Sequence, residues 1–225
     1  MVEKKQEGIV LSAFDYRESS RIISLFTPDA GIINLIIKRI AKTKTLWMNL
    51  TTPLCHGHFI YRIKRSSLHH LIDGHILNLH IDLRNSYAHL TEAGKMLRSL
   101  SQSQLHEKPA PLLYQLLLAY LRQLPRTPYP ETLGASFLLK TLKHDGLIAL
   151  SSSCLRCRIQ PSSALEGGES LCLSCASPTA LAFSSDDWAT LHDLYNNRQF
   201  SPLIHLELPV QLIHSIDTLF KRLIA

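Results

Sequence analysis

Four of the five cysteines form two closely spaced pairs, and this spacing is typical of a metal site. Two residues separate Cys154 from Cys157 and also Cys172 from Cys175, and fourteen residues lie between the pairs. Two such turns can bring four thiolates around one tetrahedral ion. Four thiolates close the coordination shell and leave no position for a catalytic water. We therefore expect one structural Zn²⁺ ion.

The sequence leaves three other states of these cysteines open, namely two disulfides, four free thiols or an iron–sulfur cluster. The start of the chain has no apolar signal segment, so we expect a cytoplasmic protein, in which disulfides are disfavoured. Residues 151–180 are rich in Ser, Cys, Pro and Gly, and a metal would hold this insertion together. Gly167-Gly168 is expected to form a tight turn, and Cys55 to be an isolated buried thiol.

Basic side chains are concentrated in the first third of the chain. Residues 1–80 carry 11 basic and 6 acidic side chains, a net +5, whereas residues 81–150 carry +3 and residues 151–225 carry −2. No acidic residue lies between Asp29 and Asp73. The basic residues of this window are Lys38, Arg39, Lys42, Lys44, Arg62, Lys64 and Arg65. They are expected to neutralise DNA phosphates, with Arg17 and Arg21 extending the patch; the alternative is a merely solvated face.

Aromatic residues in this region are candidates for stacking on unpaired bases. Trp47 lies in the basic connection and is the preferred candidate, with local packing as the alternative. Phe59 and Tyr61 share the apolar face of a predicted strand, so we expect both in the core.

The elements that must position these residues change character near residue 80. Before it, alternating apolar residues predict five short strands, which suit a small antiparallel barrel whose loops and one sheet face bind nucleic acid. The strands are expected at Glu7–Phe14, Arg21–Thr27, Ile32–Ile40, Gly57–Arg65 and Leu68–Leu79. A basic connection, Ala41–Cys55, links the third strand to the fourth.

After residue 80 the apolar spacing is helical. Helices are expected over 87–100, Pro111–Leu124, Thr132–His144, from the cap at Ser184 to Tyr195, and after Pro209. The fold class is therefore α+β, with a barrel domain at 1–80, a helical domain at 81–150 and 181–225, and a zinc-binding insertion at 151–180.

The last helix ends with Phe220, Lys221 and Arg222. Cations beside an apolar stripe could receive an acidic, hydrophobic peptide tail. The alternative is that Lys221 and Arg222 compensate the helix dipole while the stripe is buried. An adaptor that binds such a tail, with little direct DNA binding, is the second functional hypothesis.

Several enzyme classes are excluded by missing motifs. The sequence has no G-x-x-x-x-G-K-[ST] loop, no G-x-G-x-x-G and no G-x-S-x-G. No acidic cluster accompanies the basic window, which argues against two-metal nuclease chemistry. No apolar run is long enough to span a bilayer, so no membrane association is expected. The pattern favours a binding protein that is not an enzyme.

The order of motifs resembles the RecO family of bacterial recombination mediators. The resemblance rests on Glu7-Gly8-Ile9-Val10-Leu11, on residues 15–27, on Gly31, Lys38-Arg39, Tyr87, residues 137–140, Gly146, Gly167-Gly168 and the two cysteine pairs. It implies an OB-fold domain, a helical domain and a zinc module. It also implies recombinational DNA repair in the nucleoid: binding of single- and double-stranded DNA, strand annealing, and work with RecR and the tail of the single-strand-binding protein SSB to load RecA at gaps.

Overall fold

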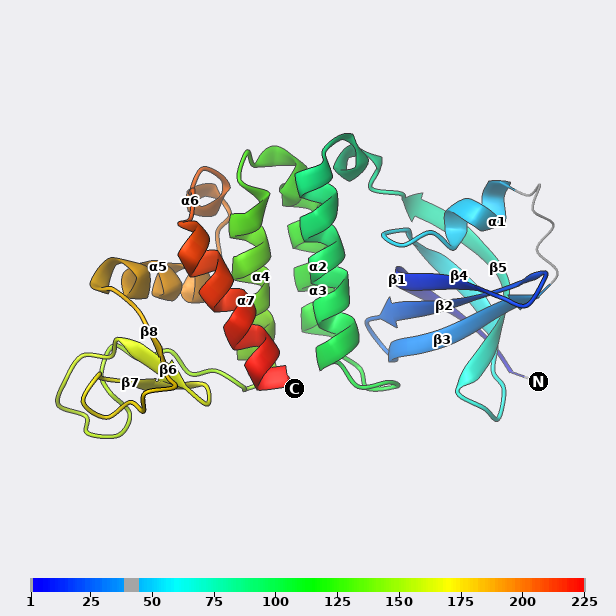
Figure 1. Cartoon of the computed structure of the whole chain (residues 1–225). Coiled ribbons are helices and arrows are strands. Elements are labelled where there is room, and N and C mark those ends of the chain that lie inside the picture. The colour runs from blue at the N-terminus through cyan, green and yellow to red at the C-terminus, as the bar shows by residue number, and fades with distance from the viewer. Residues whose placement is uncertain (1, 39–44, 225) are drawn as a thin grey trace. The chain divides into compact units, whose positions relative to one another are not determined.

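The alternating apolar residues of the first 80 positions form a closed five-stranded barrel in the computed structural model, which describes residues 2–38 and 45–224 (Figure 1). The strands are β1 (Glu3–Tyr16), β2 (Ser20–Thr27), β3 (Gly31–Lys38), β4 (His56–Arg62) and β5 (Leu68–Asn78), in the order β1-β2-β3-β5-β4. All neighbouring strands are antiparallel except β3 and β5, which are parallel. The predicted five-stranded barrel is confirmed, but the parallel β3–β5 pair departs from the fully antiparallel arrangement that was expected.

One face of each strand fills the barrel. Ile23, Leu25 and Leu35 are fully buried there, together with Phe59. Tyr61 is also buried, so the prediction that these two aromatics are core residues is confirmed. Cys55 lies in the same core, where burial, partly opposed by the charge of Arg84, raises the pKa of its thiol to about 12. This cysteine is an inert packing residue, as expected.

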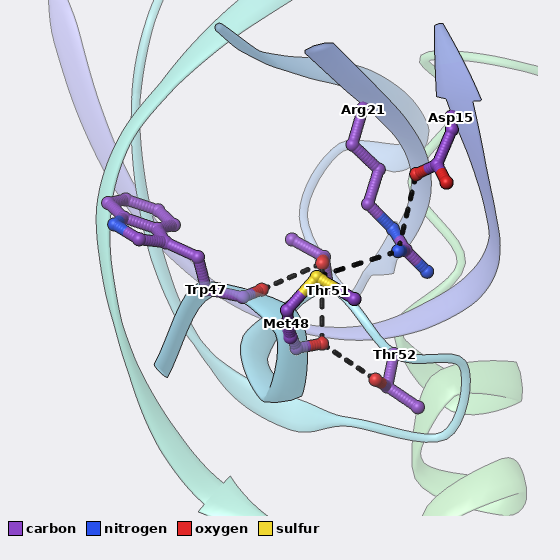
Figure 2. A network of polar contacts seen from close by, with 6 residues as sticks. All are labelled: Asp15, Arg21, Trp47, Met48, Thr51 and Thr52. Atoms are coloured by element: carbon purple, nitrogen blue, oxygen red, sulfur yellow. Dashed lines mark hydrogen bonds and ion pairs between the residues drawn. The ribbon is translucent and has the colours of Figure 1, made fainter. Parts of the chain in front are cut away.

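The connection between β3 and β4 contains a short helix, α1 (Thr45–Leu50), where the sequence indicated only a loop. Trp47 packs against the barrel core and anchors the helix. The helix ends where two hydroxyls donate to its last carbonyls: Thr51 Oγ1 to Trp47 O and Thr52 Oγ1 to Met48 O, each at 2.7 Å (Figure 2). A single turn and a half shows no detectable helical period in a sequence.

Two helices pack with the barrel in one compact unit, Met1–Pro125. A 3-10 turn, η1 (Ile81–Asn85), leads into α2 (Tyr87–Ser103), and α3 (Pro111–Gln123) follows. From α3, the Tyr114 ring lies 5.7 Å from Phe26 and its hydroxyl donates to Glu7 at 3.2 Å. The first compact unit therefore extends to Pro125 and does not end at residue 80, where the sequence predicts a domain boundary.

The second compact unit, Arg126–Ala225, is built around α4 (Pro130–His144), which follows a short 3-10 turn, η2 (Leu124–Arg126). The helices α5 (Ser185–Asn196), α6 (Ser201–Ile204) and α7 (Val210–Ile224) pack against α4. Ser184 caps α5 as predicted, because its Oγ accepts the Asp187 N–H at 3.1 Å.

A three-stranded sheet lies between α4 and α5 in the chain. Its strands are β6 (Ala164–Glu166), β7 (Glu169–Leu171) and β8 (Leu181–Ala182), in the order β7-β6-β8. Strands of two or three residues are too short for a readable alternation, so the sequence did not predict them. Within residues 2–38 and 45–224, no helix combines the length and hydrophobicity required to span a bilayer.

Candidate metal centre and nucleic-acid interface

The two cysteine pairs meet in the second unit. The sulfur atoms of Cys154, Cys157, Cys172 and Cys175 all lie within 4.8 Å of one another. Cys157 Sγ and Cys172 Sγ are 3.8 Å apart. A tetrahedral site with metal–sulfur bonds of about 2.3 Å has sulfur–sulfur edges of about 3.8 Å. The spacing therefore fits a single metal ion held by four sulfur ligands.

Backbone amides of the first turn face its sulfurs. N–H groups, first that of Cys157 and then those of Cys172 and Arg156, lower the pKa of Cys154 to about 6 against an opposing effect of desolvation. The amides of Gln160 and Ile159 lower the pKa of Cys157. These amides stabilise thiolates, which are the form that binds a metal.

Cys175 in the second turn shows the opposite pKa shift. Hydrogen bonding to the Cys172 sulfur and desolvation raise the pKa of Cys175 to about 12. A cation at the centre of the cluster would reverse this effect, because it stabilises all four thiolates together.

The strands and one arginine hold the two turns together. Gly167 and Gly168, with φ of 56° and 86°, form the tight turn between β6 and β7, as predicted. Arg156 from the first turn donates to the Cys175 carbonyl and lies 3.9 Å from Glu166. Among the described residues, the hydrophobic cluster around the site has three buried members, Cys154, Leu171 and Cys172, so two of the three are cysteines of the site.

Four of the predicted DNA-contacting cations meet in a cleft on the barrel. The cleft has a volume of about 640 Å³ and lies between the β1–β2 turn, β3 and the start of β5. Among the residues that the structure describes, no acidic side chain lines it. Its lining residues are Tyr16, Arg17, Ile36, Lys38, Lys64, Arg65, Ser66, Leu68 and His70.

The strand register places two aromatic side chains on the same outer face. Phe14 pairs with Ile22, which pairs with Ile36, and Tyr16 pairs with Ser20, which pairs with Lys38. Directly paired residues share a face of the sheet. Phe14 is 53% exposed and Tyr16 is 39% exposed. The Arg17 guanidinium carbon lies 5.2 Å from the centre of the Tyr16 ring.

Sequence reasoning missed these two aromatics because it ended the first strand at Phe14 and treated Asp15-Tyr16-Arg17 as a polar boundary. The usable signal was the i, i+2 spacing of Phe14 and Tyr16 around Asp15, which continues the strand period into the turn.

The pKa of His70 reflects the positive charge of the cleft. Desolvation lowers the pKa of this imidazole, and the positive charges of Lys38, Lys64 and Arg62 lower it further. A group that is harder to protonate near three cations reports a positive local potential, which suits a polyanion.

The remaining predicted residues do not line the cleft. Arg21 is only 15% exposed and lies 3.4 Å from Asp15 and 4.0 Å from the Met48 sulfur (Figure 2). Arg62 pairs with Glu3 at 2.7 Å. Trp47 is half-buried against the core. Arg39, Lys42 and Lys44 lie outside the residues that the structure describes.

The predicted peptide site at the end of α7 contains one buried residue and two residues at the surface. Phe220 is only 4% exposed and belongs to the core of the second unit. Lys221 is exposed. Arg222 donates to the Thr179 carbonyl at 3.0 Å. The apolar stripe is therefore used for packing, while both cations remain at the surface.

Comparison with known proteins gives consistent matches along most of the chain. Residues 1–80 match the family described as recombination protein O N terminal, and residues 84–205 match recombination protein O C terminal. A DNA repair protein RecO of Chlamydia trachomatis serovar D is 29% identical over 218 residues, which cover 95% of this chain and 89% of that protein. The protein of the same name from Chlamydia pneumoniae is 28% identical over 96% and 86%. The one from Bacillus subtilis is 26% identical over 69% and 61%.

Proposed function

Since the chain belongs to the recombination protein O family of DNA repair proteins, we propose that it binds single- and double-stranded DNA and anneals complementary strands. The observation that carries this proposal is the barrel cleft, in which Arg17, Lys38, Lys64 and Arg65 gather without an acidic neighbour in the lining. Cations held around one cleft can neutralise successive phosphates of a bound strand.

Annealing requires no bond chemistry, so the proposed activity is not enzymatic. Cations in the cleft screen the repulsion between two phosphate backbones. The exposed Tyr16 ring lies beside Arg17, and the exposed Phe14 ring lies on the same outer face of the sheet. Unpaired bases can stack on such rings. A strand held in this way keeps its bases available to a complementary strand.

The metal in this proposal is one structural Zn²⁺ ion, held by Cys154, Cys157, Cys172 and Cys175. The sulfur spacing and the closed four-sulfur shell support the ion's structural role. These residues would hold the insertion together rather than activate a substrate.

Family membership supports a proposed wider role in recombinational repair. The protein would act in the nucleoid with RecR and SSB to load RecA at single-stranded gaps. The exposed Lys221 and Arg222 are the proposed contacts for the acidic tail of SSB, with Phe220 supporting them from the core. An Arg222→Glu variant is expected to bind that tail more weakly in a peptide titration.

The DNA proposal is tested by the salt dependence of binding. A Lys38→Gln, Arg65→Gln variant should bind an oligothymidine less tightly, and its plot of log K against log salt should be shallower by about 1.4, since each single-strand phosphate contact contributes about 0.7 to that slope. Arg122→Gln, which removes an exposed cation of α3 outside the cleft, is the matched control. Equal slopes for all three proteins would contradict the cleft assignment.

Base stacking is tested separately. Tyr16→Ala should weaken binding of single strands by about 1–3 kcal/mol and slow annealing, with a smaller effect on duplex binding. Tyr87→Ala removes a more exposed ring outside the cleft and should change neither. If the full zinc-loaded chain binds DNA negligibly at low salt, the adaptor hypothesis replaces this proposal.

A further inference from the structure

A second groove of the first unit shares no lining residue with the cationic cleft. It has a volume of about 420 Å³ and lies between β1, the loop before β4, η1 and α2. Leu54, Leu90 and Leu97 contribute to its apolar wall. Arg84 and Arg98 are its charged residues within the described part of the chain, which contributes no carboxylate to the lining.

One wall of this groove is a strand edge. β4 pairs with β1 only as far as Ile9, and the loop before β4 continues the ladder at Val10, whose N–H donates to Cys55 O and whose carbonyl accepts the Leu54 N–H, both at 2.9 Å. Within the described residues, no strand pairs with β1 on this side beyond Val10. Residues 11–13 therefore present an open backbone edge to the groove. Such an edge can accept an extended chain as an added strand.

The chemistry of the groove favours a peptide over a nucleic acid. Its lining contains no aromatic ring on which a base could stack, and its apolar surface is aliphatic. Arg84 makes a long hydrogen bond, 3.5 Å, to the Pro53 carbonyl. Arg98, the second arginine that lines the groove, is exposed. A complementary ligand carries aliphatic side chains for the wall and carboxylates for the arginines.

The floor of the groove contains a glycine that helix packing does not explain. Gly94 lies in the middle of α2, where glycine costs about 1 kcal/mol relative to alanine. A Cβ added there would meet only Arg98 Nη1, at 3.5 Å. No neighbouring element of the fold requires the missing side chain, and its absence keeps the groove open.

We propose that this groove docks an extended, acidic and aliphatic segment of a partner protein as an additional strand on the free edge of β1. The groove supplies backbone groups from β1, apolar contacts from α2, and charge from Arg84 and Arg98. The proposal does not rest on DNA binding, because none of these residues lines the cationic cleft.

The test uses the full zinc-loaded chain and a fluorescein-labelled heptapeptide with three aliphatic residues between two pairs of aspartates. Fluorescence anisotropy should show saturable binding, and a matched peptide with lysines in place of the aspartates should bind at least tenfold more weakly. An Arg84→Glu, Arg98→Glu variant should lose about tenfold or more in affinity, as expected for a lost charge-assisted bond. Gly94→Leu, which fills the floor, should lose a similar factor while the thermal transition stays intact.

A control variant locates the peptide. Arg122→Glu reverses the charge of one exposed arginine on α3 outside the groove and should leave the affinity unchanged. Loss of binding with Arg222→Glu alone would place the peptide on α7 and overturn the proposal. The proposal also fails if the groove variants bind the peptide normally but lose affinity for an oligothymidine, because the groove would then belong to the DNA interface.

Discussion

At the scale of single residues, type and spacing determined the metal centre, whereas neighbours distant in sequence determined the cleft. Two C-x2-C turns predict four converging sulfurs, and the structure brings them within 4.8 Å. His70 offered no comparable signal. Its role depends on Lys38, 32 positions earlier in the chain, which the pairing of β3 with β5 brings near it.

The protonation of His70 predicts that DNA affinity depends on pH. Desolvation and the nearby cations lower the pKa of its imidazole below the usual value, so the side chain is neutral at pH 7 in the free protein. Bound phosphates favour the protonated form and raise this pKa, so DNA affinity should increase as pH falls from 7.5 to 5.5. A His70→Asn variant should show a smaller increase when both proteins are titrated in the same buffers. An identical pH profile would show that His70 does not contact the bound DNA.

At the scale of elements, long periodic segments were predictable and short ones were not. The five strands and five of the helices lie close to their expected positions. The sequence did not reveal α1, α6 or the strands β6–β8, because elements of two to six residues span too few periods to be recognised and are stabilised by tertiary contacts. The Gly167-Gly168 turn was the exception, since its residue type alone indicates the backbone conformation.

The two glycines of this turn should differ in their tolerance of substitution. Gly168 has a φ of 86°, and a Cβ there would lie 2.0 Å from the Leu147 carbonyl oxygen. Gly168→Ala should therefore destabilise the second unit by about 1–3 kcal/mol, as measured by denaturant unfolding. Gly167→Asn is the matched control, because its Cβ position is open and Asn accepts a left-handed backbone. Equal losses for both variants would show that the close approach to Leu147 is unimportant.

At the scale of the whole molecule, the two compact units divide the charge and the proposed tasks. Met1–Pro125 carries 16 basic and 9 acidic side chains, a net +7, and Arg126–Ala225 carries 8 and 9, a net −1. The overall +6 thus resides in the unit that contains the cationic cleft. The four-cysteine cluster lies in the other unit.

This division predicts that metal removal and DNA binding are separable. A strong chelator, or Cys154→Ser, should remove about one metal ion per chain and unfold the insertion, since structural sites of this kind couple ligation to folding. Metal analysis and limited proteolysis within residues 151–180 would detect both effects, with Cys55→Ala as the control that retains the metal. Affinity for an oligothymidine should remain within about twofold of the original, because the barrel folds in a different compact unit. A parallel loss of DNA binding would contradict the separation.

The sequence by itself determined the properties that depend on near neighbours: the strand and helix periods, the two cysteine pairs, the glycine turn and the acid-free basic window. Only the tertiary structure decided which cations line the same cleft. Lys38, Lys64 and Arg65 reach one cleft because β3 and β5 pair in parallel, whereas ion pairs hold Arg21 and Arg62 elsewhere. Tyr16 and Phe14 join this face because the β1–β2 register places them there. Such pairings are set by core packing between distant segments, and a local pattern contains no information about them.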